Sequence, residues 1–158
     1  MFFNTRNVNL GDHQKIIDVM PNWWGGRDLT SGLSKIYFIH FQNSSFVTLN
    51  DGNIIGFLIG FMSQSIKNQA YIQLAGVDPN FRKQGVAKML YNEFYEICKK
   101  SSISTVTSCT SPVNELSIKF HQSMGFEILK GDCIENGYEI TSNYLGEGNH
   151  KVLFKKDI

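Results

Sequence analysis

The stretch that decides the fold is AGVDPNFRKQGVA, residues 75–87. Its first residues are apolar and typical of a strand, which Asp78-Pro79 ends because proline cannot donate a hydrogen bond to a sheet. Gly85 stands where an amphipathic helix begins, with apolar residues recurring at three- and four-residue intervals over residues 86–97. The sequence therefore predicts a strand, a loop and a helix in succession.

The loop of this unit has the composition of a phosphate-binding site. N–H groups in the first turn of a helix can approach an anion closely where Gly85 and Ala87 carry little side chain. Arg82, Lys83 and Lys88 add positive charge beside the positive pole of the helix dipole. The loop lacks the Gly-Lys-Ser/Thr of a Walker motif and the three spaced glycines of a dinucleotide fingerprint. The alternative is that Gly85 only allows tight packing and that the basic residues form a solvated turn.

A second motif, NELSIKFHQSMGF, lies downstream at residues 114–126. Together the two motifs resemble those of the GNAT superfamily of N-acetyltransferases, Arg/Gln-x-x-Gly-x-Gly/Ala and Asn-x-x-Ala-x-x-Phe-Tyr-x-x-x-Gly-Phe. The resemblance covers about residues 45–130. Finer details, among them Trp-Trp-Gly-Gly and Thr-Ser-Pro-Val-Asn, are similar to a poorly characterised subgroup of that superfamily.

The resemblance implies a binding site for acetyl-CoA. Backbone groups of residues 75–77 would pair with the pantetheine arm as an added strand, and amides of residues 82–87 would hold the pyrophosphate. Asn114 would also contact the cofactor, its alternative role being a hydrogen bond at a helix end. The predicted cofactor-binding residues are Ala75, Gly76, Val77, Arg82, Lys83, Gln84, Gly85, Val86, Ala87, Lys88, Asn114, Ser117 and Phe120.

His121 stands where many members of the superfamily carry a tyrosine that would protonate the leaving CoA thiolate. Imidazole can donate a proton, since its ordinary pKa near ~6.5 leaves a protonated fraction at neutral pH. We therefore predict His121 as the catalytic residue, with a packed or cofactor-contacting side chain as the alternative. Trp23 and Trp24, beside two glycines, are predicted to line the acceptor pocket or else to wedge helices onto the sheet.

The implied reaction is transfer of the acetyl group of acetyl-CoA to a primary amine by direct attack in a ternary complex. Alignment of the amine against the thioester accounts for most of the rate enhancement, because it lowers the activation barrier by about 7–11 kcal/mol in well-aligned cases. The acceptor is a small molecule or a peptide, and the sequence does not choose among peptide amines, polyamines, aminoglycosides and other metabolites. A non-catalytic acyl-CoA-binding sensor or scaffold is the alternative, motivated by His121, and a nucleotide-binding domain unrelated to CoA is a third hypothesis.

Composition argues against several other classes of protein. Lys and Arg number 15 against 14 Asp and Glu, so we expect neither nucleic acid nor a membrane as a partner. The longest apolar stretch, residues 54–62, is less than half the roughly 20 residues of a membrane-spanning helix. The amino terminus lacks a signal-peptide core, and the three cysteines match no disulfide or zinc pattern. We expect a cytoplasmic protein with reduced thiols and no metal, and a homodimer stays open.

Residues 1–158 are expected to form one GNAT domain of α/β (α+β) class. Its sheet would be mixed and mostly antiparallel, with about seven strands flanked by about four helices. Before the decisive unit we expect an edge strand at residues 3–9, a helix that Pro21 stops, a second helix from Arg27 to His40, and a hairpin across residues 45–62.

After that unit we expect a strand at residues 103–109 and a helix that Ser111-Pro112 starts and Gly125 ends. Residues 131–150 are expected to form a long loop before the final strand. The apolar residues expected to point inward from the last helix are Val113, Leu116, Phe120 and Met124.

Overall fold

The computed structural model describes residues 2–158, which form a seven-stranded sheet and a separate two-stranded hairpin. The order in the sheet is β1-β2-β3-β4-β5-β9-β6. β4 and β5 run parallel, whereas the other neighbouring strands within residues 2–158 are antiparallel, so the predicted mixed sheet is confirmed. The strands are β1 (Asn4–Asn7), β2 (Phe46–Asn50), β3 (Asn53–Met62), β4 (Gln69–Val77), β5 (Thr105–Thr110), β6 (Glu127–Ile128), β7 (Cys133–Glu135), β8 (Tyr138–Ile140) and β9 (Val152–Asp157).

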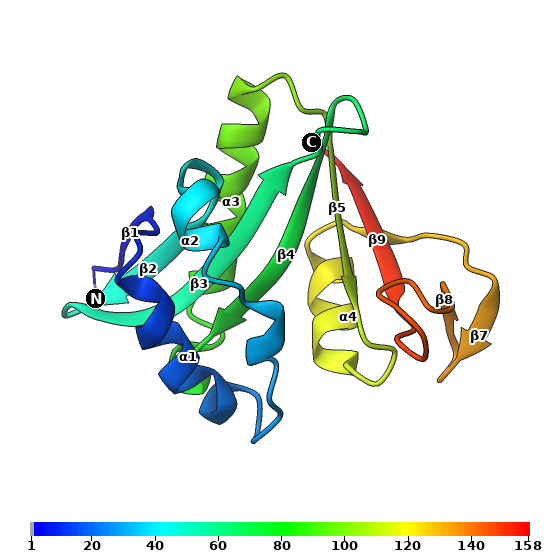
Figure 1. The fold of residues 1–158 in the computed structure, drawn as a ribbon, viewed down its shortest axis with the longest axis horizontal. Helices are drawn as coiled ribbons and strands as arrows, with labels where there is room; N and C mark the ends of the chain where they lie inside the picture. The colour runs from blue at the N-terminus through cyan, green and yellow to red at the C-terminus, as the bar shows by residue number, and fades with distance from the viewer. Residues whose placement is uncertain (1) are drawn as a thin grey trace.

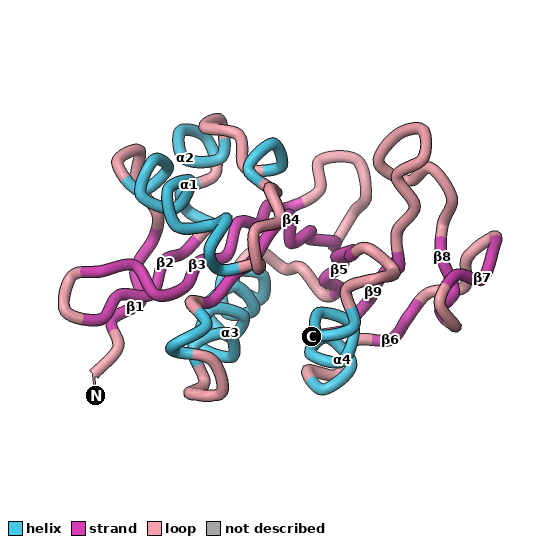
Figure 2. The backbone as a smooth tube through the Cα atoms, turned by 90° about the horizontal axis from the view of Figure 1, so that it is seen from below, coloured by secondary structure: helices cyan, strands magenta, loops and turns pink. Residues whose placement is uncertain are grey.

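Helices cover both faces of the sheet (Figure 2). α1 (Asp12–Trp23) and α2 (Tyr37–His40) lie on one face, and α3 (Val86–Lys100) and α4 (Glu115–Ser123) lie on the other. A cluster of buried apolar side chains fills the space between the sheet and each helical layer. The four helices of the described residues therefore agree with the expected number, and the sheet separates two cores.

β4 is the strand that opens the site. Its pairing with β5 ends at Ile72 and Ser108, although β4 continues to Val77 alongside β3. Its register with β3 also shifts, because Ile59 pairs with Leu74 and the next residue pairs with Ile72, which leaves Gln73 in a bulge. A bulge bends a strand and strengthens its twist. β4 and β5 consequently diverge at their carboxyl ends, as Figure 1 shows.

α1 does not stop at Pro21, as the sequence had suggested. The helix continues to Trp23, and the amide of Trp24 still donates to the carbonyl of Met20 at 3.3 Å. Proline removes only its own hydrogen bond to the preceding turn, which is a small loss at the end of a helix. Met20 and Trp23 are both buried, and their packing holds the last turn in place.

The predicted second helix from Arg27 to His40 is wrong. The segment forms a 3₁₀ turn at Thr30–Gly32 and the single turn α2. The carboxylate of Asp28 accepts the amide and the hydroxyl of Thr30, which gives the backbone a local alternative to a helix. Leu33 and Phe38 are buried whereas Ile36 is 56% exposed, so the expected apolar face does not exist.

The start of the last helix was also misplaced. Ser111-Pro112 lie in a turn, and α4 begins after Asn114, whose side-chain oxygen accepts the amide of Ser117 at 3.2 Å. The predicted terminator is confirmed, since Gly125 has a φ of 85°. The inward face is wrong at two positions: Val113 is 63% and Leu116 is 76% exposed. Ile118 and His121 are the buried residues of this helix, because the helix turns that side to the sheet.

The expected loop at residues 131–150 contains the hairpin of β7 and β8. Its turn is Asn136-Gly137, with φ values of 51° and 79°. Asn-Gly is the strongest short signal for a two-residue hairpin, so this element was present in the sequence and was missed. The hairpin lies at the end of the molecule beyond α4 (Figure 1).

Two expectations about the chain's surroundings can be compared with the fold. Within residues 2–158, no helix has the length and hydropathy needed to cross a bilayer. Cys98, Cys109 and Cys133 are all free thiols, at buried, half-buried and exposed positions respectively.

Gly60 is a position in the sheet core that leaves no room for a side chain. A Cβ added there would lie 2.8 Å from Cζ of Phe94 and closer still to another atom of that ring. We expect Gly60→Ala to lower the free energy of unfolding by about 2 kcal/mol, because overpacking forces a buried ring to move. Urea denaturation measures this. Gly32→Ala, where an added Cβ would meet nothing within 4 Å, is the matched control, and equal losses in both variants would contradict the argument.

Candidate functional site

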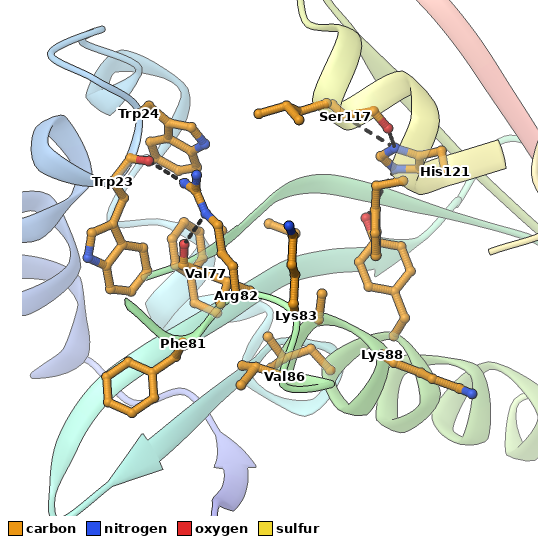
Figure 3. Close-up of a pocket in the computed structure, with 18 of the residues that line it drawn as sticks. Trp23, Trp24, Val77, Phe81, Arg82, Lys83, Val86, Lys88, Ser117 and His121 are labelled. Carbon is orange, nitrogen blue, oxygen red and sulfur yellow. Dashed lines mark hydrogen bonds between the residues drawn. The ribbon is translucent and has the colours of Figure 1, made fainter. Parts of the chain in front are cut away.

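A cavity of about 720 Å³ lies where β4 leaves β5, between the loops that precede α3 and α4 (Figure 3). It brings together nearly all the predicted site residues. Gln84 does not line it, since its exposed side chain donates instead to the carbonyl of Asn80 at 3.1 Å. The predicted residues in its wall are Trp23, Trp24, Ala75, Gly76, Val77, Arg82, Lys83, Gly85, Val86, Ala87, Lys88, Asn114, Ser117, Phe120 and His121.

The loop before α3 presents free backbone donors to this cavity. Gly85 precedes the helix with a φ of 84°, a left-handed conformation that favours glycine, and no side chain caps the helix there. Within residues 2–158, the amides of residues 83–88 have no hydrogen-bond acceptor. Lys83 and Lys88 add positive charge to the same wall. Free amides, a positive helix pole and two cations together are suited to binding an anion.

Arg82 ties this loop to the end of α1. Its guanidinium donates to the carbonyl of Val77 at 3.3 Å and to the carbonyl of Trp23 (Figure 3). From the sequence, this charge is predicted to lie beside a bound phosphate, with a solvated turn as the alternative. The structure shows that the side chain also satisfies a carbonyl at the C-terminal end of α1, so Arg82 joins the indole pair to the anion-binding loop.

Gly76 allows an indole to lie directly on β4. A Cβ at this position would lie 2.8 Å from Cζ2 of Trp24 and 2.9 Å from the ring of Phe57. The ring of Trp23 stacks on the ring of Phe57, with the two centroids 6.0 Å apart. Both tryptophans therefore pack α1 against the sheet and line the larger cavity, and their predicted role in binding the acceptor stays a prediction.

His121 is buried at the inner end of the cavity, with 5% of its surface exposed. Its Nδ1 lies 2.7 Å from the carbonyl of Ser117, which can only accept, so Nδ1 carries a proton. In the neutral ring, Nε2 then accepts the hydroxyl proton of Tyr91 at 3.0 Å. Phe154 stacks on the imidazole with centroids 4.4 Å apart. Burial lowers the pKa of His121, although the Ser117 carbonyl opposes this, so the resting imidazole is neutral.

The lowered pKa of His121 predicts a loss of stability in acid. Near pH 6.5 the imidazole of the unfolded chain takes up a proton while the folded one does not, so folding is favoured above that pH. Stability falls as pH drops below about 6.5, by at most about 1.4 kcal/mol per pH unit for one proton. Urea denaturation between pH 7.5 and about 5 measures this. The slope should shrink in His121→Gln, and an identical slope in the variant would contradict the burial argument.

A second, smaller cavity of about 260 Å³ adjoins the first and is lined by residues of β4 and β5. The two spaces meet at the residues that line both of them, which are Trp24, Arg27, Ala75, Tyr91, Asn114, Ser117 and His121. Sequence reasoning missed Tyr91, whose phenol occupies an inward position of α3 that nothing in the local pattern distinguishes from packing. It also missed the smaller cavity, to which Gln73 contributes from the bulge in β4.

The chain is similar to known proteins both in sequence and in fold. The model of the Acetyltransferase (GNAT) family matches residues 15–126. An aminoglycoside N(6')-acetyltransferase type 1 of Salmonella typhimurium is 32% identical over 90 residues, which are 53% of this chain and 62% of that protein. The chain thus spans less than two thirds of the length of this curated relative.

Solved structures share the fold at low sequence identity. Ard1 from Thermoplasma volcanium is 20% identical with a TM-score of 0.80, and the match covers 100% of this chain and 99% of that one. PaiA N-acetyltransferase from Thermoplasma acidophilum, in complex with coenzyme A, is 17% identical with a TM-score of 0.77 over 100% of both chains.

Proposed function

Because the chain belongs to the GNAT family of acetyltransferases, we propose that it transfers the acetyl group of acetyl-CoA to a primary amine. The observation that carries this proposal is the meeting of two cavities at Ala75 on the free edge of β4. The larger cavity has an anion site at one end and suits a cofactor with a diphosphate. The smaller cavity is also lined by Ala75 and suits the amine.

The residues of the larger cavity fit coenzyme A group by group. The unpaired amides of residues 83–88 hold the diphosphate, with Lys83 and Lys88 beside it. The edge of β4 from Gln73 to Val77, which β5 does not pair with, offers backbone donors and acceptors to the pantetheine arm. Asn114 keeps its oxygen on the amide of Ser117 and lines the cavity near the same arm.

Acetyl-CoA supplies an activated thioester. The chain's own residues therefore have two main tasks, which are to position the two substrates and to move a proton. The walls of the two cavities hold amine and thioester together, which contributes most of the rate. Amides on the free edge of β4 donate to the carbonyl oxygen as negative charge develops on it. A bond forms from the amine nitrogen to the acetyl carbon, the bond from that carbon to sulfur breaks, and one proton must pass from nitrogen to sulfur.

His121 is the proposed carrier of that proton. A neutral imidazole can accept the proton of the attacking amine through the hydroxyl of Tyr91 and return it to the departing thiolate. Both side chains line both cavities, and they are joined by the 3.0 Å hydrogen bond. The lowered pKa suits this role, because the carrier must start without the proton. If His121 instead began the reaction as a protonated imidazolium, it would have to be in the charged form that burial disfavours.

The proposal is tested by mixing the protein with acetyl-CoA and an amine panel and following the release of free thiol. The panel contains an N-terminal peptide, a polyamine, an aminoglycoside and a set of amino acids. Thiol release that depends on one of these amines supports the proposal. Calorimetry with acetyl-CoA separates the alternatives: binding without thiol release favours a non-catalytic sensor, and no binding contradicts both.

A further inference from the structure

The smaller cavity is positively charged. Within residues 2–158, no Asp or Glu side chain lines either cavity. Two basic residues line the smaller one: Lys151 from the start of β9, and Arg27 from the segment after α1, which is exposed and also lines the larger cavity. Neither of them forms an ion pair among the described residues. Their charges are therefore available to whatever occupies the cavity.

The backbone of Lys151 is held by two hydrogen bonds to Thr141. Its amide donates to the carbonyl of Thr141 at 3.1 Å, and its carbonyl accepts the amide of Thr141 at 2.8 Å. Lys151 lines the smaller cavity together with Ser108, Cys109 and Thr110 of β5. The other polar groups in the wall are neutral, and they include Gln73 and Asn149.

An acceptor amine with further positive charges is a poor occupant of such a cavity. Like charges facing each other in a concave, partly buried space repel strongly, and this is a common means of excluding wrong ligands. Polyamines and aminoglycosides carry several ammonium groups and would meet Arg27 and Lys151 with no carboxylate in the walls to compensate. A ligand with a negative group would instead gain a charge-assisted hydrogen bond.

We propose that the acceptor is a small amine that also carries an anionic group, a carboxylate or a phosphate. Lys151 and Arg27 bind the anionic group while the amine points to the junction at Ala75. A cavity of about 260 Å³ accommodates a small amine of about the size of an amino acid. This inference rests on the proposed acetyl transfer and adds the class of substrate, which differs from that named for the 32% identical relative.

Matched amines test the proposal through the release of thiol from acetyl-CoA. Each amino acid is compared with its carboxamide, phosphoethanolamine with ethanolamine, and both pairs with spermidine and kanamycin. We expect kcat/KM to be at least about tenfold higher for the anionic member of a pair. The two pairs distinguish a carboxylate from a phosphate. Higher kcat/KM for spermidine or kanamycin than for every anionic amine would overturn the inference and leave acetyl transfer intact.

Lys151→Met locates the charge that acts. It should raise KM for the anionic acceptor about tenfold and leave KM for the carboxamide or ethanolamine unchanged. Lys130→Met removes an exposed lysine that lines neither cavity and is the matched control. Lys151→Glu should shift the preference toward spermidine. If Lys151→Met and Lys130→Met have the same KM for the anionic acceptor, the inference is wrong.

Direct binding keeps the two proposals separable if no amine is turned over. The protein saturated with coenzyme A is titrated with the same amines in a calorimeter. The inference is supported if anionic amines bind with measurable heat and if Lys151→Met weakens this binding. Absence of heat from every anionic amine overturns it. Failure to bind coenzyme A at all contradicts the proposed function itself.

Discussion

Gly85→Glu is expected to weaken the binding of coenzyme A at least about 100-fold. The added side chain would stand at the positive end of α3, where Gly85 has a φ of 84° and an added Cβ meets nothing within 4 Å. The carboxylate would therefore occupy the anion site without a clash inside the protein. It would repel the diphosphate and take up the free amides that we assign to it. Calorimetric titration with coenzyme A measures the change.

The backbone strain of this substitution needs its own control. A non-glycine residue in the left-handed region costs about 1 kcal/mol at any site. Gly52 has a φ of 79° in the turn between β2 and β3, and an added Cβ there also meets nothing within 4 Å. Gly52→Glu should lose the same stability and keep its affinity for coenzyme A. If Gly85→Glu binds coenzyme A with unchanged affinity, the proposed anion site at the start of α3 is wrong.

His121→Ala is expected to lower kcat about 100-fold and to change the affinity for acetyl-CoA only a few-fold. General acid–base groups contribute about 10²–10⁴ in rate, whereas the amides and lysines that we assign to the diphosphate lie on another element. Steady-state kinetics with the best amine of the panel, together with calorimetry, separates the two quantities. Equal kcat in the variant and the parent protein would end the role of His121 as proton carrier.

Tyr91→Phe distinguishes proton transfer from packing. It keeps the ring that packs edge-on against Phe120 and Phe126 and removes only the hydroxyl bonded to His121. If the pair carries the proton, this variant loses kcat although its fold is preserved. The pH profile adds a second readout: the parent kcat falls where His121 becomes protonated, which the lowered pKa places below about 6.5. A variant that acts through packing alone would keep that profile.

The errors at the ends of helices share one cause, whereas the missed hairpin of β7 and β8 had a local signal in Asn136-Gly137. Pro21, the apolar residues of the Arg27–His40 segment and the Ser111-Pro112 pair are local signals that compete with packing. Trp23 holds the last turn of α1 despite Pro21 because it is buried against Phe57, a residue 34 positions further along the chain. Sequence periodicity does not contain such contacts, so helix ends were less well predicted than the sheet.

By itself the sequence determined the central unit, from β4 through the anion-binding loop to α3, and most of the residues around it. These features depend on local physics: an apolar strand ended by Asp78-Pro79, a glycine with positive φ, and a helix with an apolar face. Only the tertiary structure decided that β4 and β5 diverge, that Tyr91 meets His121, and that Arg27 and Lys151 share a cavity without a carboxylate. Each of these joins residues that lie far apart in the chain, and their meeting is set by how the sheet twists and packs.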